Sequence, residues 1–127
     1  MIAGIGIDAI DINRFSDWHN YPQKKLLRVF TPEEIVYCLT VPAKTAERFA
    51  ARFAAKEAFY KAFSSTEPQH NVPFLTLCKA IRIHSSGSGK PELRVAWQIL
   101  NTTPLKSFIS LTHTPTTATA IVILENS

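Results

Sequence analysis

The residues best suited to chemistry are concentrated between Arg52 and Lys61. This stretch of ten residues, RFAAKEAFYK, contains three cations and one carboxylate, and its other residues are alanines and aromatics. In a helix, Arg52 stacks on Lys56 and Glu57 stacks on Lys61, because the members of each pair are four residues apart. Stacked like charges destabilise an isolated helix by roughly a few tenths of a kcal/mol. We therefore expect an anionic ligand to bind beside this segment.

Asp8 is a second carboxylate in apolar surroundings. It follows the strand-like segment 2–7, whereas Glu57 lies inside the apolar helix. Carboxylates in such places are costly unless they pair with cations or a metal ion. Asp8 could simply cap the next helix while Glu57 pairs with Lys61. Alternatively, both could bind one Mg²⁺, which takes one or two carboxylates and completes its shell with water and phosphate oxygens. The three cations would then neutralise those phosphates.

Three further features have both a structural and a functional interpretation. His113 shares a strand face with apolar residues, and it is either a structural histidine or a ligand-binding one. The turn at residues 89–91 is either only a turn or a ligand contact, and it lacks the spacing of a P-loop. A cationic segment near the N-terminus is either a solvated helix face or a docking surface for an acidic helix. That segment comprises Arg14, Lys24, Lys25 and Arg28.

Mixed helices and strands are expected to position these residues. A buried strand at 2–7 places Ile5 and Ile7 on one face and Gly4, Gly6 and Asp8 on the other. The shift to Ile10 and Ile12 predicts a turn or bulge just after Asp8. Thr31, Pro32 and Glu34 predict a capped helix over 31–39. The remaining predicted elements are a helical segment through residues 15–18, a short basic helix at 23–30, a long helix at 44–64, a polar loop at 64–73, a hairpin of 81–83 with 93–97 around the loop 85–91, and a hairpin of 108–113 with 118–124.

Composition limits the classes of protein to which the chain can belong. Its 127 residues are 46% hydrophobic and 19% charged, which is typical of one globular domain over 1–127. No apolar run approaches the roughly 20 residues that span a bilayer, and the N-terminus lacks the features of a signal peptide. The two cysteines are isolated, so a reducing cytoplasm is expected. The net charge of +4 favours an acidic partner.

Four motifs occur together in an order that resembles the short 4′-phosphopantetheinyl transferases, the holo-acyl-carrier-protein synthase family. The resemblance extends over essentially the whole chain. The motifs are GIGID at residues 4–8 with Arg14, FTPEE at 30–34, RFAAKEA at 52–58 and SLTHT at 110–114.

This resemblance implies an α+β subunit that assembles as a homotrimer with three sites at subunit interfaces. The implied reaction, part of fatty acid biosynthesis, transfers phosphopantetheine from coenzyme A to a serine of apo acyl carrier protein and releases adenosine 3′,5′-bisphosphate. The residues matching Asp8 and Glu57 hold Mg²⁺ at the pyrophosphate, and the residue matching Lys61 contacts phosphate.

The resemblance also assigns binding residues. Arg52, His113 and Thr114 match family positions near the adenosine and its 3′-phosphate, and Lys44 is grouped with them. The loop beside the adenine is matched by Gly89, Lys90 and Pro91. Arg14, Lys24 and Arg28 match the surface that receives the acidic carrier protein. Two departures are a missing glycine-rich turn at residues 64–68 and a tyrosine at position 21 where a basic residue is usual.

Two other functions fit parts of the same pattern. A non-catalytic module that binds coenzyme A would use the cations but would not need two carboxylates at one metal. A nucleic-acid-binding domain would use the net charge, but the aromatics lie in helical core stripes and do not alternate with Lys or Arg on an exposed strand. For the transferase, Glu57 is the hypothesised base, acting directly or through a metal-bound water. No nucleophile is needed in this chain because the serine belongs to the partner.

Overall fold

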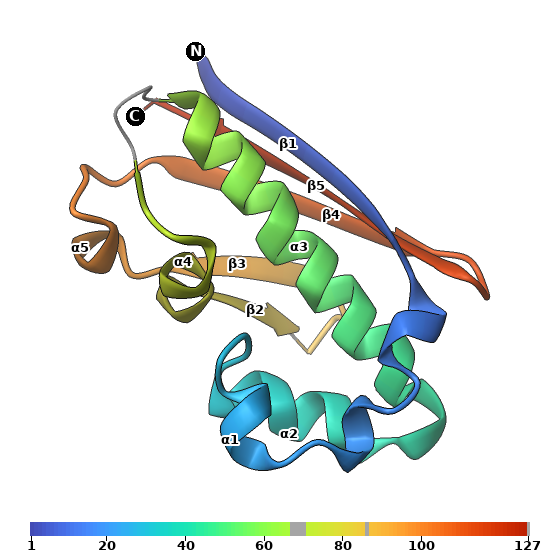
Figure 1. Ribbon diagram of the computed structural model, residues 1–127. Helices are drawn as coiled ribbons and strands as arrows, with labels where there is room; N and C mark the ends of the chain where they lie inside the picture. The colour runs from blue at the N-terminus through green and yellow to red at the C-terminus, as the bar shows by residue number, and fades with distance from the viewer. Residues whose placement is uncertain (67–70, 86, 127) are drawn as a thin grey trace.

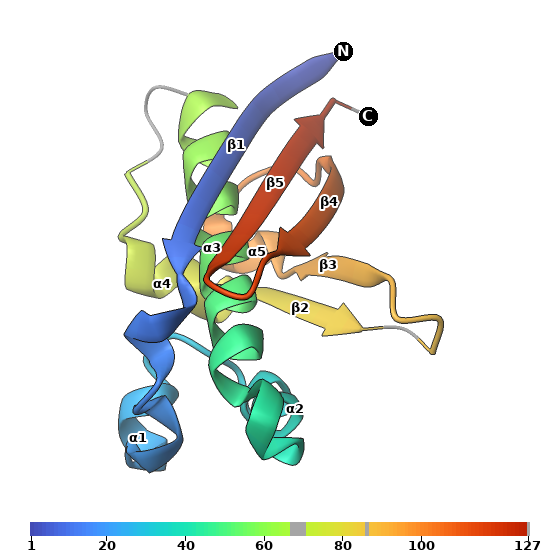
Figure 2. The ribbon, with the colours of Figure 1, turned by 90° about the vertical axis from the view of Figure 1, so that its right-hand side faces the viewer.

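Helix α3 (Thr45–Thr66) lies across one face of a three-stranded antiparallel sheet (Figure 1). The computed structural model describes residues 1–66, 71–85 and 87–126. The strand order is β1 (Ile2–Asp11), β5 (Thr117–Glu125) and β4 (Lys106–His113). A separate hairpin of β2 (Ile81–Ser85) and β3 (Pro91–Val95) projects sideways from the molecule in Figure 2. The expected α+β fold is confirmed.

Short helices cover the parts of α3 that the sheet leaves free. They cluster near the beginning of α3 and beside the β2–β3 hairpin (Figures 1 and 2). The α-helices are α1 (Gln23–Leu26), α2 (Pro32–Thr40), α4 (Phe74–Ala80) and α5 (Trp97–Leu100), and the 3-10 turns are Ile12–Phe15, Trp18–Asn20 and Pro42–Lys44. None of the described helices is both long enough and apolar enough to cross a membrane.

The close approach of α3 to β1 depends on two glycines. A Cβ atom at Gly4 would overlap the carbonyl oxygen of Ala62, and one at Gly6 would overlap that of Ala58. Small residues on both elements therefore let the two backbones meet directly. The side chains of β5 that face α3 are also buried, from Ala118 at one end to Leu124 at the other.

Helix α2 is tied to α3 by a buried ion pair. Thr31 accepts a hydrogen bond from the amide of Glu34, and the Glu34 carboxylate accepts one from the amide of Thr31, which forms the expected capping box. The same carboxylate lies 2.7 Å from the ammonium nitrogen of Lys56 and accepts a hydrogen bond from the amide of Ile83. One glutamate thus joins α2, α3 and β2.

The face of the sheet that points away from α3 is apolar and open. Ile5 and Ile7 are 53% and 58% exposed, so the expectation of a buried strand is wrong for this face. Ile5 pairs across the ladder with Ile123, and Ile123 pairs with Phe108 on the next strand. These pairs form an apolar row across all three strands, because residues directly opposite each other in a ladder share one face.

Four expectations about the elements need correction. The predicted turn after Asp8 is absent, because β1 pairs regularly with β5 from Gly4 to Asp11. Ile10 has the same parity as Gly4, Gly6 and Asp8, so no shift of register was required. The segment near Trp18 forms 3-10 turns, and α1 is shorter than predicted. Trp97 begins α5 and does not extend β3.

The long-helix, α2 and C-terminal hairpin predictions are confirmed within a few residues. The predicted loop 64–73 begins later than expected, since α3 continues to Thr66. Positions 67–70 of that loop, and position 86 of the predicted loop 85–91, lie outside the described residues.

Candidate active site

Asp8 and Lys61 meet where β1 passes over the middle of α3. The Lys61 ammonium nitrogen donates to the Asp8 carboxylate at 3.1 Å and to the carbonyl oxygen of Ile7 at 3.0 Å. The Asp8 side chain is 17% exposed and that of Lys61 is 51% exposed. Asp8 lies within β1 and therefore does not cap a helix.

Glu57 belongs to the same cluster. Its pKa is raised first by burial and then by the negative charge of Asp8, while the positive charges of Lys61 and Arg14 oppose the rise. Two carboxylates on separate elements are thus close enough for one to disfavour ionisation of the other. The first strand and the long helix have brought together the two acids that the sequence pattern singled out.

The donor set suits a hard cation that arrives with a phosphate ligand. In the described part of the chain, no group of three His, Cys, Asp or Glu side chains could hold a metal ion. Asp8 and Glu57 offer two carboxylates, which is the number that Mg²⁺ takes when water and phosphate oxygens complete its shell. The residues present therefore fit Mg²⁺ bound jointly with a phosphate compound.

A second site lies on the other side of α3. This pocket has a volume of about 250 Å³ and is bounded by the first half of α3, the end of β4 and the turn after β2. We call it the cationic pocket. Five residues expected at a nucleotide site line it, namely Lys44, Arg52, Gly89, Pro91 and His113.

Arg52 forms part of the wall of the cationic pocket although its side chain is almost fully buried. One terminal nitrogen donates to the Ser85 hydroxyl at 3.1 Å, and the guanidinium carbon lies 4.0 Å from the centre of the Tyr37 ring. The Nε atom of Arg52 is buried and has no hydrogen-bond partner among the described residues. A buried donor without a partner is costly, and a ligand acceptor would remove that cost.

His113 and Thr114 lie where β4 ends. The His113 Nε2 atom is 3.0 Å from the carboxylate of Glu47, and both residues line the cationic pocket. The Thr114 hydroxyl accepts hydrogen bonds from the amides of Thr116 and Thr117, so it holds the turn into β5. Lys90 is exposed between Gly89, which has a left-handed φ of 80°, and Pro91.

Sequence reasoning missed several residues that line the cationic pocket, among them Tyr37, Glu47, Arg48 and Ser85. Arg48 could have been found, because it precedes Arg52 by four residues and extends the same stacked row of cations. Tyr37 and Ser85 come from other elements, and nothing in their own sequence neighbourhood indicates that they approach α3.

The assignment of Lys56 to phosphate binding is wrong. Its side chain is completely buried beside Glu34. The ammonium nitrogen also donates to the backbone carbonyl oxygens of Val29, Cys78 and Ile81. With its charge paired and its donors used inside the core, Lys56 holds α3 against α2 and β2 and does not reach a ligand.

Helix α3 separates the two sites within one chain. Glu57 and Arg52 are five residues apart and point to well-separated sides of the helix. Across the sheet, Asp8 pairs with Ala120 and Ala120 pairs with Leu111, which lines the cationic pocket. Asp8 and Leu111 are thus two strands apart, about 10 Å from the strand spacing alone, with α3 over the sheet between them.

The predicted docking cations are exposed and lie toward one end of the molecule. Arg14 is in the first 3-10 turn, Lys24 is in α1, and Arg28 follows α1. The effect of Arg14 on the pKa of Glu57 places this cation near the acidic cluster. An acidic partner bound along this surface would approach the two carboxylates.

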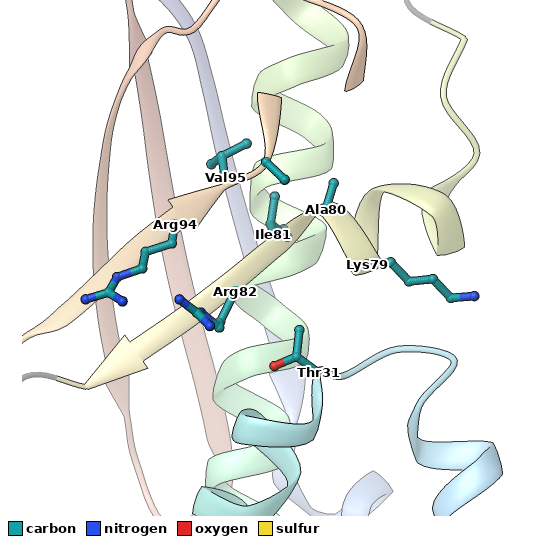
Figure 3. A pocket seen from close by; sticks show the side chains of 8 residues that line it. Thr31, Lys79, Ala80, Ile81, Arg82, Arg94 and Val95 are labelled. Atoms are coloured by element: carbon teal, nitrogen blue, oxygen red, sulfur yellow. The ribbon is translucent and has the colours of Figure 1, made fainter. Parts of the chain in front are cut away.

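Figure 3 shows a different basic pocket, of about 310 Å³, beside the β2–β3 hairpin. Arg82 and Arg94 face each other in the ladder, and Lys79 points away from them. Arg82 is paired with Glu33 at 2.8 Å, so part of this charge is already neutralised. None of the residues predicted for the site lines this pocket.

Residues 4–122 match the model of the 4′-phosphopantetheinyl transferase superfamily. The holo-acyl-carrier-protein synthases of Treponema denticola and Geotalea daltonii are each 38% identical to this chain over 130 aligned positions. The alignments cover 98% of this chain and 99% of each relative.

Among known structures, the ACPS–CoA complex of Chronobacterium ammoniagenes aligns with a TM-score of 0.81 at 26% identity, covering 98% of this chain and 97% of that one. The Bacillus anthracis holo-acyl-carrier-protein synthase in complex with CoA (3′,5′-ADP) aligns with a TM-score of 0.76 at 32% identity, covering 100% and 99%.

Proposed function

Because the chain belongs to the 4′-phosphopantetheinyl transferase superfamily, we propose that it is a holo-acyl-carrier-protein synthase. It transfers the 4′-phosphopantetheine group of coenzyme A to a serine of apo acyl carrier protein and releases adenosine 3′,5′-bisphosphate. The observation that carries this proposal is the meeting of Asp8, Glu57 and Lys61 at one point of the fold. A non-catalytic module that only binds coenzyme A has no need for this acid cluster.

The reaction exchanges one phosphorus–oxygen bond for another. The carrier serine oxygen bonds to the phosphorus that bears pantetheine, and the bond from that phosphorus to the bridging oxygen breaks. The serine proton passes to a base, and the bridging oxygen leaves on adenosine 3′,5′-bisphosphate. Such a transition state spreads charge over phosphate oxygens, so catalysis depends mainly on positioning and electrostatic stabilisation.

Glu57 is the proposed base. In the metal-free site, burial and the Asp8 charge raise the pKa of its carboxyl group. Lys61, held against Asp8 and exposed on its other side, can donate to an oxygen of the pyrophosphate. Asp8 and Glu57 would hold Mg²⁺, which when bound neutralises charge on the pyrophosphate.

The cationic pocket is the proposed nucleotide site. Lys44, Arg52 and His113 line it, together with the turn at 89–91, and the residues bring donors and positive charge to a space suited to a phosphorylated adenosine. Thr114 fixes the turn beside it. Arg14, Lys24 and Arg28 form the proposed docking surface for acidic carrier protein, where exposed charge would act mostly on the rate of association.

Assembly is part of the proposal. In one chain the acidic cluster lies toward the β1 edge and the cationic pocket toward the β4 edge, with α3 over the sheet between them. In a homotrimer, the β1 side of one subunit could meet the β4 side of the next and complete a shared site. The open apolar row of Ile5, Ile123 and Phe108 supports this assembly, because such a face needs a cover. A cytoplasmic location stays a prediction.

The test is to incubate the protein with coenzyme A, Mg²⁺ and apo acyl carrier protein, and to measure the mass of the carrier. We expect a mass increase equal to one phosphopantetheine and an equal amount of adenosine 3′,5′-bisphosphate. Glu57→Gln should still bind coenzyme A while turnover falls by ~10²-fold or more, as removal of a general base does.

Two results would contradict these assignments. Full turnover by Glu57→Gln would remove Glu57 as the base. Binding of coenzyme A by the wild type, with no carrier modification at any Mg²⁺ concentration, would favour the non-catalytic module.

A further inference from the structure

Two arginines of the cationic pocket share one aromatic ring. The guanidinium carbons of Arg48 and Arg52 each lie 4.0 Å from the centre of the Tyr37 ring. Arg48 also donates to the backbone carbonyl oxygen of Tyr37 at 2.8 Å. Tyr37 belongs to α2 and the arginines to α3, so this contact joins two helices at the wall of the pocket.

The Tyr37 ring offsets the repulsion between the Arg48 and Arg52 guanidinium groups. Arg48 and Arg52 are four residues apart on α3 and therefore stack as like charges. The negative face of an aromatic ring attracts a guanidinium group and favours a planar, stacked arrangement. Tyr37 can therefore hold both groups in place without neutralising either of them.

The charge at this wall remains available to a ligand. Lys44 is exposed on the same wall, and the nearby carboxylate of Glu47 lies 3.0 Å from the Nε2 atom of His113. Arg52 retains a buried Nε–H without a partner among the described residues. Two guanidinium groups, one of which has an unused donor, match an anion with several oxygens and more than one negative charge.

We propose that Tyr37 is a positioning residue that holds Arg48 and Arg52 as a paired site for a phosphate monoester. A monoester carries a second negative charge near neutral pH, with a second pKa of about 6, whereas each phosphate of a pyrophosphate diester carries one. The inference rests on the proposed function. It makes Tyr37 and Arg48 determinants of the preference for coenzyme A over its 3′-dephospho form.

The test compares Tyr37→Leu and Tyr37→Phe in carrier modification, with coenzyme A and 3′-dephospho-coenzyme A as substrates. Tyr37→Leu removes the ring, and we expect KM for coenzyme A to rise about 5- to 10-fold, the scale of one or two cation–π contacts. Its kcat should change less than 2-fold, and KM for the dephospho form should hardly change. Tyr37→Phe keeps the ring and should retain the wild-type preference.

Direct binding gives a second readout that does not depend on turnover. Calorimetry should show that Tyr37→Leu loses affinity for adenosine 3′,5′-bisphosphate but not for adenosine 5′-monophosphate. Arg48→Lys keeps the charge and loses the planar group, so it should lower the same affinity even if Tyr37→Leu fails to fold. Tyr60→Leu, a matched change at a tyrosine that packs on Phe74, should leave the ratio of the two affinities unchanged.

Equal increases in KM for both substrates would overturn the inference, because they would mean that Tyr37 contacts the adenosine itself. A fall in kcat without a change in KM would also overturn it. Absence of carrier modification by the wild type would instead contradict the proposed function, and the calorimetric comparison would still decide the role of Tyr37.

Discussion

Glu57 lies where burial and a second carboxylate both disfavour its charged form. Lys61 and Arg14 offset only part of that effect, so the pKa stays raised. Such an arrangement costs stability and is retained where a bound cation or a proton transfer uses it. By contrast, the Glu34–Lys56 ion pair is fully buried, and each charged group has its hydrogen-bond partners inside the protein. The two glutamates show how surroundings separate a reactive acid from a structural one.

The raised pKa of Glu57 predicts a pH-dependent cost in stability. Between the ordinary pKa of glutamate and the raised one, the folded state retains a proton that the unfolded state has lost, so stability falls as pH rises through this window. Glu57→Gln cannot titrate. Without Mg²⁺, we expect it to be more stable than wild type at pH 7, by less than about 1 kcal/mol because solvent screens a partly exposed group.

Thermal unfolding in a chelator from pH 3.5 to pH 7.5 measures this difference. The gain of Glu57→Gln should shrink toward zero at the acidic end of the range. Added Mg²⁺ should stabilise the wild type more than the variant, because binding to the folded state raises stability. A variant that is less stable than wild type at pH 7 would show that the Glu57 charge is favourable and that the pKa shift has the opposite sign.

At the scale of elements, α3 carries residues of both sites and its position over the sheet fixes where they lie. The helix rests on β1 through Gly4 and Gly6, and it is locked on its other side by Lys56. A shift of α3 away from β1 would move Glu57 and Lys61 away from Asp8. The contact between the glycines and the helix backbone is therefore a structural requirement of the acidic cluster.

Gly6→Ala tests this requirement. The new methyl group would overlap the Ala58 carbonyl oxygen, which belongs to the helix backbone and cannot rotate away. We expect a loss of about 1–3 kcal/mol in the free energy of unfolding, the usual scale of overpacking, together with lower transfer activity. Chemical denaturation measures the first effect and the carrier assay the second.

Gly87→Ala is the matched control, because a Cβ atom there meets no other atom within 4 Å. It should change neither stability nor activity by a measurable amount. If Gly6→Ala also changed neither stability nor activity, α3 could move away from β1 at no cost. The close packing would then not be what positions the acidic cluster.

At the scale of the whole molecule, one face of the sheet lacks a cover. Ile5, Ile7 and Phe108 are each about half exposed, although this face is apolar. Extended apolar surfaces of this kind usually mark a contact with another protein surface. The separation of the acidic cluster from the cationic pocket gives a second reason to expect neighbouring copies, since each copy holds its two parts of the site on different sides of α3.

Ile5→Asp tests the proposed assembly. A charge in the middle of the apolar row should prevent burial of this face. We therefore expect light scattering to show a monomer for the variant and the proposed trimer for the wild type. Transfer activity should fall with the loss of the assembly if the sites are shared. Ile99→Asp is the control, since Ile99 is 51% exposed on α5, outside the sheet, and the variant should remain trimeric. A monomeric and fully active wild type would contradict the shared site.

Much of the local structure could be predicted because local chemistry decides it. Thr31 and Glu34 specify the start of α2, and alternation specifies the strands that end at His113 and begin near Ala118. The exposure of Ile5 could not be predicted in this way. An isoleucine that alternates with glycine has the same pattern whether it faces the core of its own chain or a surface left for a neighbour.

Residue types and spacing alone singled out Asp8 and the RFAAKEAFYK segment as candidates for a site, because acids and cations in apolar surroundings are costly unless they are paired or bind a ligand. Only the tertiary structure decided which cations remain available. Arg52 lines the pocket, whereas Lys56, one turn further along the same helix, is buried in an ion pair with Glu34. The physical reason is that pairing and burial depend on groups from distant parts of the chain, and spacing along one helix does not show which of its faces will meet them.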